Sequence, residues 1–185
     1  MMSRQFALFD TAIGRCAIAW SGLGIVAVQL PEAREADTRA RTKRRLPGAS
    51  EAPPPPAVAR VVAAIVALLG GEASDLSTVV LDMDGVPEFN RRVYAIARQI
   101  PPGATLTYGE IARRLGDPGL ARAVGQALGR NPFAIIVPCH RVLAAGGKLG
   151  GFSANGGADT KRRMLAIEGA PAGEPTLFDA LDPAP

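Results

Sequence analysis

The chain has 185 residues, 48% of them hydrophobic, and a net charge of +4. This length suffices for one substantial core or two small ones, and no apolar stretch reaches the roughly 20 residues of a membrane-spanning helix. The first residues also lack the apolar core of a signal peptide. These features argue against a membrane protein, and we expect two compact domains in the cytoplasm.

The chain has few of the side chains that bind metals or form disulfides. The chain contains two cysteines, Cys16 and Cys139, and one histidine, His140. A closed zinc site would need all three of them plus a carboxylate. The two cysteines could pair, but a chain of this size does not indicate a secreted disulfide scaffold. We therefore expect free thiols, no metal and no cofactor.

The positive charge is concentrated in four clusters of basic residues. They are Arg41, Lys43, Arg44 and Arg45; Arg91 and Arg92; Arg113 and Arg114; and Lys161, Arg162 and Arg163. Such clusters suit phosphate groups, although solvated helix faces show the same pattern. The charge therefore permits a nucleic-acid partner without proving one.

The N-terminal part of the chain predicts a small α/β domain over residues 1–84. Short apolar segments at residues 6–9, 16–20 and 25–30 are separated by glycines, which indicates an antiparallel meander. Residues 31–57 lose this periodicity and contain four consecutive prolines, so we interpret them as a loop or linker with at most a frayed helical turn. A buried helix over residues 58–69 and a further strand over residues 76–83 complete this domain.

The pattern changes to successive helices in residues 85–170, so the predicted fold class is α+β. Helices are expected at residues 88–99, 108–115 and 118–129, and the last two fit a helix-turn-helix. Residues 121–129 offer few long polar side chains for reading bases in the major groove. Small residues suit a helix in the minor groove, and equally a helix packed closely on a neighbour. Residues 171–185 form a tail with a small apolar patch at residues 177–181.

A thiol lies directly beside the only histidine. An apolar, strand-like run at residues 133–137 leads into Cys139 and His140. A nearby imidazole or cation can turn a cysteine into a strong nucleophile. A bare Cys-His pair is nevertheless more often a structural cysteine beside an unrelated histidine.

The residues around this pair change that interpretation. The sequence closely resembles the O6-alkylguanine-DNA alkyltransferases, also called methylated-DNA–protein-cysteine methyltransferases, over residues 89–169. The resemblance is carried by several motifs in order: Thr107-Tyr108-Gly109-Glu110-Ile111-Ala112, Ala121-Arg122-Ala123-Val124-Gly125, Asn131-Pro132, Pro138-Cys139-His140-Arg141-Val142 and Ile167-Glu168-Gly169. It implies DNA repair by direct reversal, with one irreversible alkyl transfer per molecule from O6-alkylguanine to Cys139.

The resemblance also implies catalytic roles for individual residues. Cys139 would be the nucleophile, His140 would deprotonate it through a bound water, and Glu168 would orient the imidazole. Tyr108 would donate to guanine N3 as the base leaves. The site would further include the Ser153 N–H at O6, the carbonyls of Cys139 and Val142 at the exocyclic amine, and the Phe152 ring as a stacking wall.

Residues for binding duplex DNA follow from the same resemblance. The damaged nucleotide must leave the stack before a thiol can reach it, and Arg122 would fill the gap. Ala121 and Gly125 would let their helix lie deep in the minor groove, and Asn131 would organise the turn before the site. The implied partner is double-stranded DNA containing O6-alkylguanine, bound by a monomer.

Two positions depart from the family pattern. Many members have a tyrosine where this chain has Phe152, and residues 153–160 are about two residues longer than usual. A longer loop could widen the pocket or displace the Ser153 N–H. A helix over residues 160–167, starting at Asp159 or Thr160 and ending before Gly169, should still project Glu168 towards the site.

Two other functional classes compete with this prediction. An alkyltransferase-like lesion-binding module would flip alkylated guanine without chemistry, but such proteins lack the cysteine. A regulator that uses only the helix-turn-helix would leave Cys139, His140 and Glu168 without a purpose.

Overall fold

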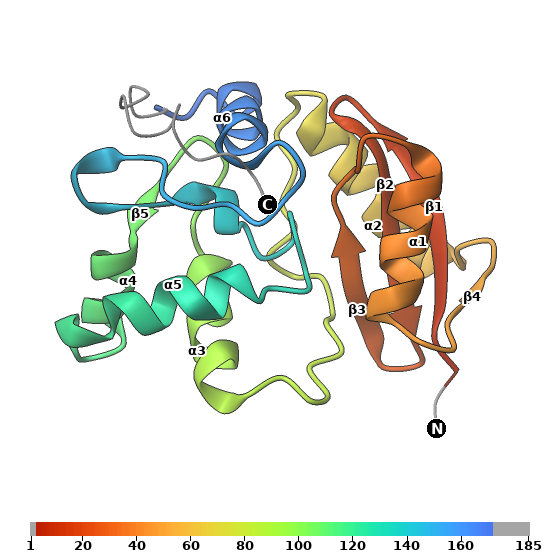
Figure 1. Cartoon of the computed structure of the whole chain (residues 1–185), viewed down its shortest axis with the longest axis horizontal. Coiled ribbons are helices and arrows are strands. Elements are labelled where there is room, and N and C mark those ends of the chain that lie inside the picture. Colours follow the sequence, from red (N-terminus) through yellow and green to blue (C-terminus); the bar gives the residue numbers. More distant parts are fainter. Residues whose placement is uncertain (1–2, 172–185) are drawn as a thin grey trace. The chain divides into compact units, whose positions relative to one another are not determined.

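The computed structural model describes residues 3–171 (Figure 1), so the predicted apolar patch at residues 177–181 lies outside the described part. The chain divides into two compact units. The first comprises the described residues up to Val86 together with Pro132–Val137, and the second comprises Pro87–Asn131 and the described residues from Pro138 onward. The fold class is α+β, as predicted.

The first unit is built on the predicted antiparallel meander. Strands β1 (Gln5–Thr11), β2 (Gly14–Ser21) and β3 (Gly24–Gln29) pair in sequence, and the short β4 (Ser50–Glu51) adds to β1 in parallel. Gly14 and Gly24 have φ angles of 127° and 147° at the two turns, where a side chain would be strained. The sheet order is therefore β3-β2-β1-β4.

Two helices pack on this sheet. Figure 1 shows α1 (Glu35–Arg45) in front of the strands and α2 (Pro56–Leu69) behind them. The buried helix predicted at residues 58–69 is confirmed as α2. The prediction of a loop at residues 31–57 is wrong, because these residues include the three turns of α1.

The sequence pattern did not predict α1 because this helix has no apolar face. Its buried residues are Thr38 and Thr42. Ion pairs join Arg39 to both Glu35 and Glu51, at 2.8 Å and 2.9 Å. The helix is therefore held by polar contacts that hydrophobic periodicity does not detect.

Two predicted strands are absent from the structure. Residues 76–83 form turns and a single bridge, in which the Ile25 N–H donates to the Val80 carbonyl at 3.0 Å. Residues 133–137 form a buried turn, with Ile135 at a φ of 73° and the Val137 N–H donating to the Phe133 carbonyl at 2.8 Å. A short buried apolar run does not by itself distinguish a strand from a turn.

The second unit is mainly helical, and it contains the predicted helices. They are α3 (Glu88–Ala97), α4 (Tyr108–Arg114), the 3-10 turn η1 (Pro118–Leu120) followed by α5 (Ala121–Gly129), and α6 (Gly157–Ile167). The buried Tyr94 hydroxyl of α3 donates to the Ala127 carbonyl of α5 at 2.9 Å. Among the described residues, no helix combines the length and the apolar character needed to cross a membrane.

A small parallel ladder connects distant parts of the second unit. Strand β5 (Leu106–Thr107) pairs with β6 (Val142–Leu143), the strand that follows η2 (Cys139–Arg141). Tyr108, the first residue of α4, comes directly after β5. The ladder thereby brings the Tyr108 motif beside the segment that carries Cys139, about thirty residues further along the chain.

Candidate active site

Cys139 lies at the start of η2, directly after Pro138. Its thiol is half-buried, and it is one of two free cysteines among the described residues. Burial raises the pKa of Cys139, while a hydrogen bond with Asn131 and the charge of Lys161 act in the opposite direction. Cys139 therefore rests as a neutral thiol and needs a base in order to act as a nucleophile.

The neighbouring His140 is part of a buried polar network. Its Nε2 lies 2.8 Å from Glu168 Oε1, and the two side chains are 0% and 1% exposed. Its Nδ1 is also buried, and no atom of the described residues is hydrogen-bonded to it. The ring is thus oriented at one nitrogen, and the other nitrogen remains free to accept a proton.

Arg141 completes this network from the same turn. Its Nε donates to Glu168 Oε2 and its Nη2 to Oε1, both at 2.8 Å, and its Nη1 donates to the Ile100 carbonyl at 2.6 Å. This is a bidentate pair, the most directional contact between a guanidinium and a carboxylate. Glu168 is therefore fixed in position while it accepts from His140.

The charges in this network follow from its geometry. Burial opposes ionisation of Glu168, but hydrogen bonds from His140 and Arg141 outweigh it and lower its pKa to about 2. Burial lowers the pKa of His140, although Glu168 favours the imidazolium form. The network thus consists of an ionised carboxylate, a guanidinium and a neutral imidazole near pH 7.

Tyr108 is positioned by a capped helix start. The Thr107 side chain accepts from the Glu110 N–H, and the Glu110 carboxylate accepts from the Thr107 N–H at 2.6 Å, which forms a capping box. Burial raises the pKa of Tyr108, and negative charge at Cys139 raises it further. The hydroxyl therefore keeps its proton and can donate it in a hydrogen bond.

A groove runs between α4, α5 and the segment after β6. Its volume is about 650 Å³, and its walls include Tyr108, Ala121, Arg122 and residues 144–147. Arg122 is exposed, and Ala121 is half-buried. The structure thus gathers three of the predicted residues around one open groove, while Cys139 is not among its lining residues.

Phe152 and Ser153 lie in the loop before α6. Phe152 is half-buried, and the exposed Ser153 hydroxyl donates to the Gly129 carbonyl at 3.4 Å. The helix predicted to start at Asp159 or Thr160 begins two to three residues earlier, because Gly156 adopts a φ of 80° and ends the loop. The Thr160 hydroxyl donates to the Asn155 carbonyl at 2.5 Å, so part of the longer segment is ordered into the first turn of α6.

Comparisons with known proteins support a single family. Residues 88–170 match the family model described as 6-O-methylguanine DNA methyltransferase, DNA binding domain. The methylated-DNA–protein-cysteine methyltransferase of Mycolicibacterium paratuberculosis is 49% identical over 127 residues, which are 68% of this chain and 74% of that protein. The protein of the same name from Methanothermobacter thermautotrophicus is 41% identical over 120 residues, 65% of this chain and 66% of that protein.

This chain belongs to the methylated-DNA–protein-cysteine methyltransferase family.

Solved structures of the family have the same fold. A crystal structure of Mycobacterium tuberculosis OGT in complex with DNA has a TM-score of 0.73 and 36% identity, covering 91% of this chain and 96% of that chain. The O6-methylguanine-DNA methyltransferase from Pyrococcus kodakaraensis strain KOD1 has a TM-score of 0.70 and 27% identity, covering 89% and 99%. The likeness therefore extends over both units of this methyltransferase.

Lys161 lies buried beside the predicted site residues Tyr108 and Phe152, a position that its sequence context did not predict. The sequence placed it in a basic cluster suited to phosphate, but its side chain is 0% exposed, and its Nζ donates to the Val142 carbonyl at 2.6 Å. A signal was present, because Lys161, Met164 and Leu165 share one face of α6 and all three are buried. Its place at the start of this buried stripe distinguishes Lys161 from the exposed Arg163.

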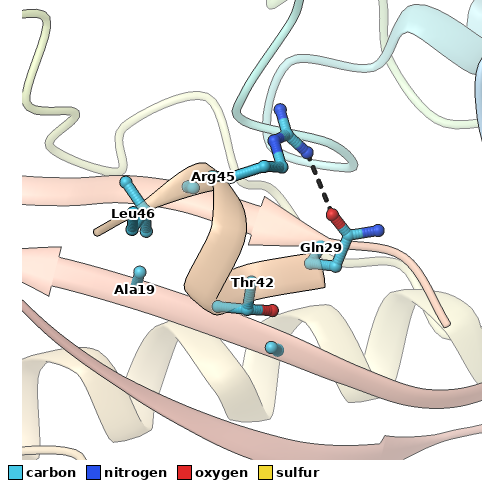
Figure 2. Close-up of a pocket in the computed structure, with 7 residues that line it drawn as sticks. Ala19, Gln29, Thr42, Arg45 and Leu46 are labelled. Atoms are coloured by element: carbon cyan, nitrogen blue, oxygen red, sulfur yellow. Dashed lines mark hydrogen bonds between the residues drawn. The ribbon is translucent and has the colours of Figure 1, made fainter. Parts of the chain in front are cut away.

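Apart from this groove, the described residues contain a small cavity and no group of side chains that could hold a metal ion. Figure 2 shows a cavity beside α1, where Arg45 Nη1 donates to Gln29 Oε1 at 3.0 Å. Its volume of about 10 Å³ has room for a single water. Within residues 3–171, no three His, Cys, Asp or Glu side chains lie together in a way that could hold a metal ion.

Proposed function

We propose that this methyltransferase repairs DNA by direct reversal, and that Cys139 takes the alkyl group from O6 of an alkylated guanine once per molecule. The observation that carries the proposal is the buried network of His140, Glu168 and Arg141 directly beside the half-buried thiol. A base oriented by a fixed carboxylate is what a resting thiol requires. The activity named for its curated relatives agrees with this chemistry.

Proton transfer accompanies the attack on the alkyl group. His140 Nδ1 accepts the thiol proton through a bound water, and Glu168 stabilises the imidazolium that forms. The sulfur then attacks the alkyl carbon in line with the bond to O6. The carbon–sulfur bond forms as the carbon–oxygen bond breaks, and its electron pair leaves with guanine. Cys139 ends as a thioether, and no group of the site removes the alkyl, so each molecule reacts once.

The leaving guanine is stabilised by donors around the pocket. Tyr108 donates to ring N3, and the backbone N–H of Ser153 faces O6. The carbonyls of Cys139 and Val142 accept from the exocyclic amine. The Val142 carbonyl already accepts from Lys161, and its second lone pair is available for guanine. Phe152 provides a flat wall for stacking.

Duplex DNA is bound by a helix-turn-helix formed by α4 and α5. Its second helix enters the minor groove, where Ala121 and Gly125 permit close approach. Arg122, which is exposed on the wall of the groove, replaces the flipped nucleotide in the stack. Asn131 follows α5 and its side chain is hydrogen-bonded with Cys139, so it connects the DNA-binding helix to the thiol. The structure of a relative in complex with DNA supports the partner.

The two parts of the chain divide this work. We place DNA binding and alkyl transfer in residues 85–170. The protein acts as a monomer in the cytoplasm. A non-catalytic lesion-binding module is not favoured, because such a module would have no use for the thiol or for the buried network beside it.

The proposal is tested by mass spectrometry of the intact protein and of its peptides. We expect a duplex containing O6-methylguanine to add one methyl group per protein, on the Cys139 peptide. A matched duplex with unmodified guanine is the control. More than one repair event per molecule, or a methyl group on Cys16, would contradict the mechanism.

A further inference from the structure

Arg113 is a cation on the wall of the groove that the proposed function leaves unused. Its side chain is exposed in the last turn of α4, and no hydrogen bond or ion pair within the described residues includes it. Its Nη2 lies 3.9 Å from the position that a Cβ would take on Gly109, the residue directly after Tyr108. The guanidinium is therefore folded back along α4, towards the end of the helix that carries Tyr108.

The described residues that line the groove include two cations and one carboxylate, and the carboxylate is already engaged. Glu110 Oε2 accepts from the N–H of Thr107 at 2.6 Å and from its hydroxyl at 2.8 Å. These hydrogen bonds lower the pKa of Glu110, so it stays ionised within the cap of α4. Arg113 of α4 and Arg122 of α5, two helices that pack against each other (Figure 1), form no ion pair in the described part of the chain. The groove is thus suited to an anion from outside the protein.

The two arginines cannot both serve as partners of the same group. Arg122 is assigned to the gap inside the duplex, where its guanidinium replaces a base. A guanine that has rotated out to meet Tyr108 stays attached to its strand, so the phosphates on either side of it pass along the same groove. A guanidinium matches two oxygens of a phosphate in a bidentate contact. Arg113 is the cation of the groove that remains available for this contact.

We propose that Arg113 binds a backbone phosphate next to the flipped nucleotide, on the strand that carries the lesion. The inference rests on the proposed function and adds a binding residue to it. Arg113 takes no part in proton transfer or in the attack on the alkyl carbon. Because the contact is made to the backbone and not to a base edge, it is independent of the sequence around the lesion.

The first experiment measures the affinity for duplex DNA as a function of salt, with Arg114→Gln as the matched control. Arg114 is exposed in the same last turn of α4 and also acts on the charge of Glu110, but it is not among the residues that line the groove. Between about 50 mM and 200 mM salt, Arg113→Gln should lower the slope of log affinity against log salt by about 0.9 and weaken binding about fivefold. Arg114→Gln should keep the wild-type slope. Equal slopes for the two variants would overturn the proposal.

The second experiment locates the phosphate. Each phosphate flanking O6-methylguanine is replaced in turn by a neutral methylphosphonate, and binding is measured with Cys139→Ser so that no methyl group is transferred. One replacement should weaken binding about fivefold, and adding Arg113→Gln should cause no further loss at that phosphate, because both changes remove the same contact. Adding Arg114→Gln should leave the sensitivity to that replacement intact. Additive losses for Arg113→Gln at every flanking phosphate would contradict the inference.

A third measurement separates this inference from the proposed function. O6-methylguanine as a free base has no backbone, so Arg113→Gln should react with it at the wild-type rate while its reaction with a duplex is slowed. A loss of rate on the free base as well would contradict a role confined to the DNA backbone. If the wild type transferred no methyl group from either substrate, the proposed function would be wrong. If the wild type repaired duplex DNA and Arg113→Gln repaired it equally well, only the role of Arg113 would be excluded.

Discussion

The two units treat buried cysteine in opposite ways. Cys16 lies on β2 of the first unit with 0% exposure, and burial raises its pKa to about 12. Cys139 of the second unit is half-buried, and both Asn131 and Lys161 counteract the effect of burial on its pKa. The same side chain is therefore packed inertly in one unit and is the proposed nucleophile in the other, and the difference lies in the polar groups around it.

The interiors of the two units also differ in the polar and charged groups that they bury. The first unit has a core cluster of Phe6, Ala19, Val26, Ala27 and Leu46, and its fully buried polar groups include the neutral Thr38. The second unit buries His140, Arg141, Lys161 and the side chain of Glu168. Buried charges seldom increase stability, so their concentration in one unit indicates a site.

The largest effect on the rate of methyl transfer should come from replacing Cys139, with replacement of Cys16 as the comparison. Cys139→Ser should lower the rate of methyl transfer from an O6-methylguanine duplex by more than about a thousandfold, because a hydroxyl is a far weaker nucleophile. Cys16→Ala should leave that rate unchanged and lower the free energy of unfolding by about 1–2 kcal/mol through lost packing. Single-turnover kinetics and urea denaturation measure the two quantities. Loss of methyl transfer in Cys16→Ala would contradict the assignment of Cys16 as an inert residue.

Removing the charge of Glu168 should have the next largest effect. Glu168→Gln should slow transfer by about 10²- to 10⁴-fold at pH 7, because His140 loses the carboxylate that stabilises its protonated form. A rate within twofold of the wild type would show that Glu168 has only a structural role.

The same substitution changes the acid stability of the protein. The pKa of Glu168 falls from its usual 4.5 to about 2 on folding, so the ionised carboxylate stabilises the fold above pH 4.5. This stabilisation is lost as the pH falls towards 2. Glu168→Gln should therefore show a weaker decrease in free energy of unfolding between pH 5 and pH 2, measured by urea denaturation. An unchanged slope would contradict the ionised network.

A smaller effect is expected at Arg122. Arg122→Ala should slow repair in duplex DNA by about tenfold or more, because the flipped state loses the guanidinium that fills the stack. Reaction with O6-methylguanine as a free base should be nearly unchanged, since no flipping is needed. The matched control is Arg130→Ala, which removes an exposed arginine just beyond the end of α5. Equal losses on duplex and free base would exclude the role in flipping.

The smallest effect should come from the cap of α4. Thr107→Ala removes the side chain that accepts from the Glu110 N–H at 3.2 Å and should lower the free energy of unfolding by about 1 kcal/mol. Since Tyr108 follows directly, the rate of transfer should also fall by a small factor. Thermal unfolding and single-turnover kinetics measure both, with Thr78→Ala, at an exposed threonine of the first unit, as the control. A stability equal to that of the wild type would show that the cap is dispensable.

Sequence patterns predicted those elements whose stability comes from apolar periodicity or from turn residues. The three-stranded meander, α2 and the helices of the second unit belong to this class. Patterns missed α1, whose buried residues are threonines, and misassigned residues 76–83 and 133–137. The misassigned residues are apolar enough for a strand, and whether a partner strand lies beside them depends on contacts far away in sequence.

The sequence by itself determined the family resemblance and the chemical types at the site, because the adjacent Cys139 and His140 and the motifs around them are local. The resemblance already paired His140 with Glu168, 28 residues further along the chain, and only the tertiary structure showed that Arg141 holds the same carboxylate. It alone decided that Lys161 points into the site while Arg163, two residues later on the same helix, faces solvent. The reason is physical: a basic residue has the same composition on either face of a helix, and packing determines which face is buried.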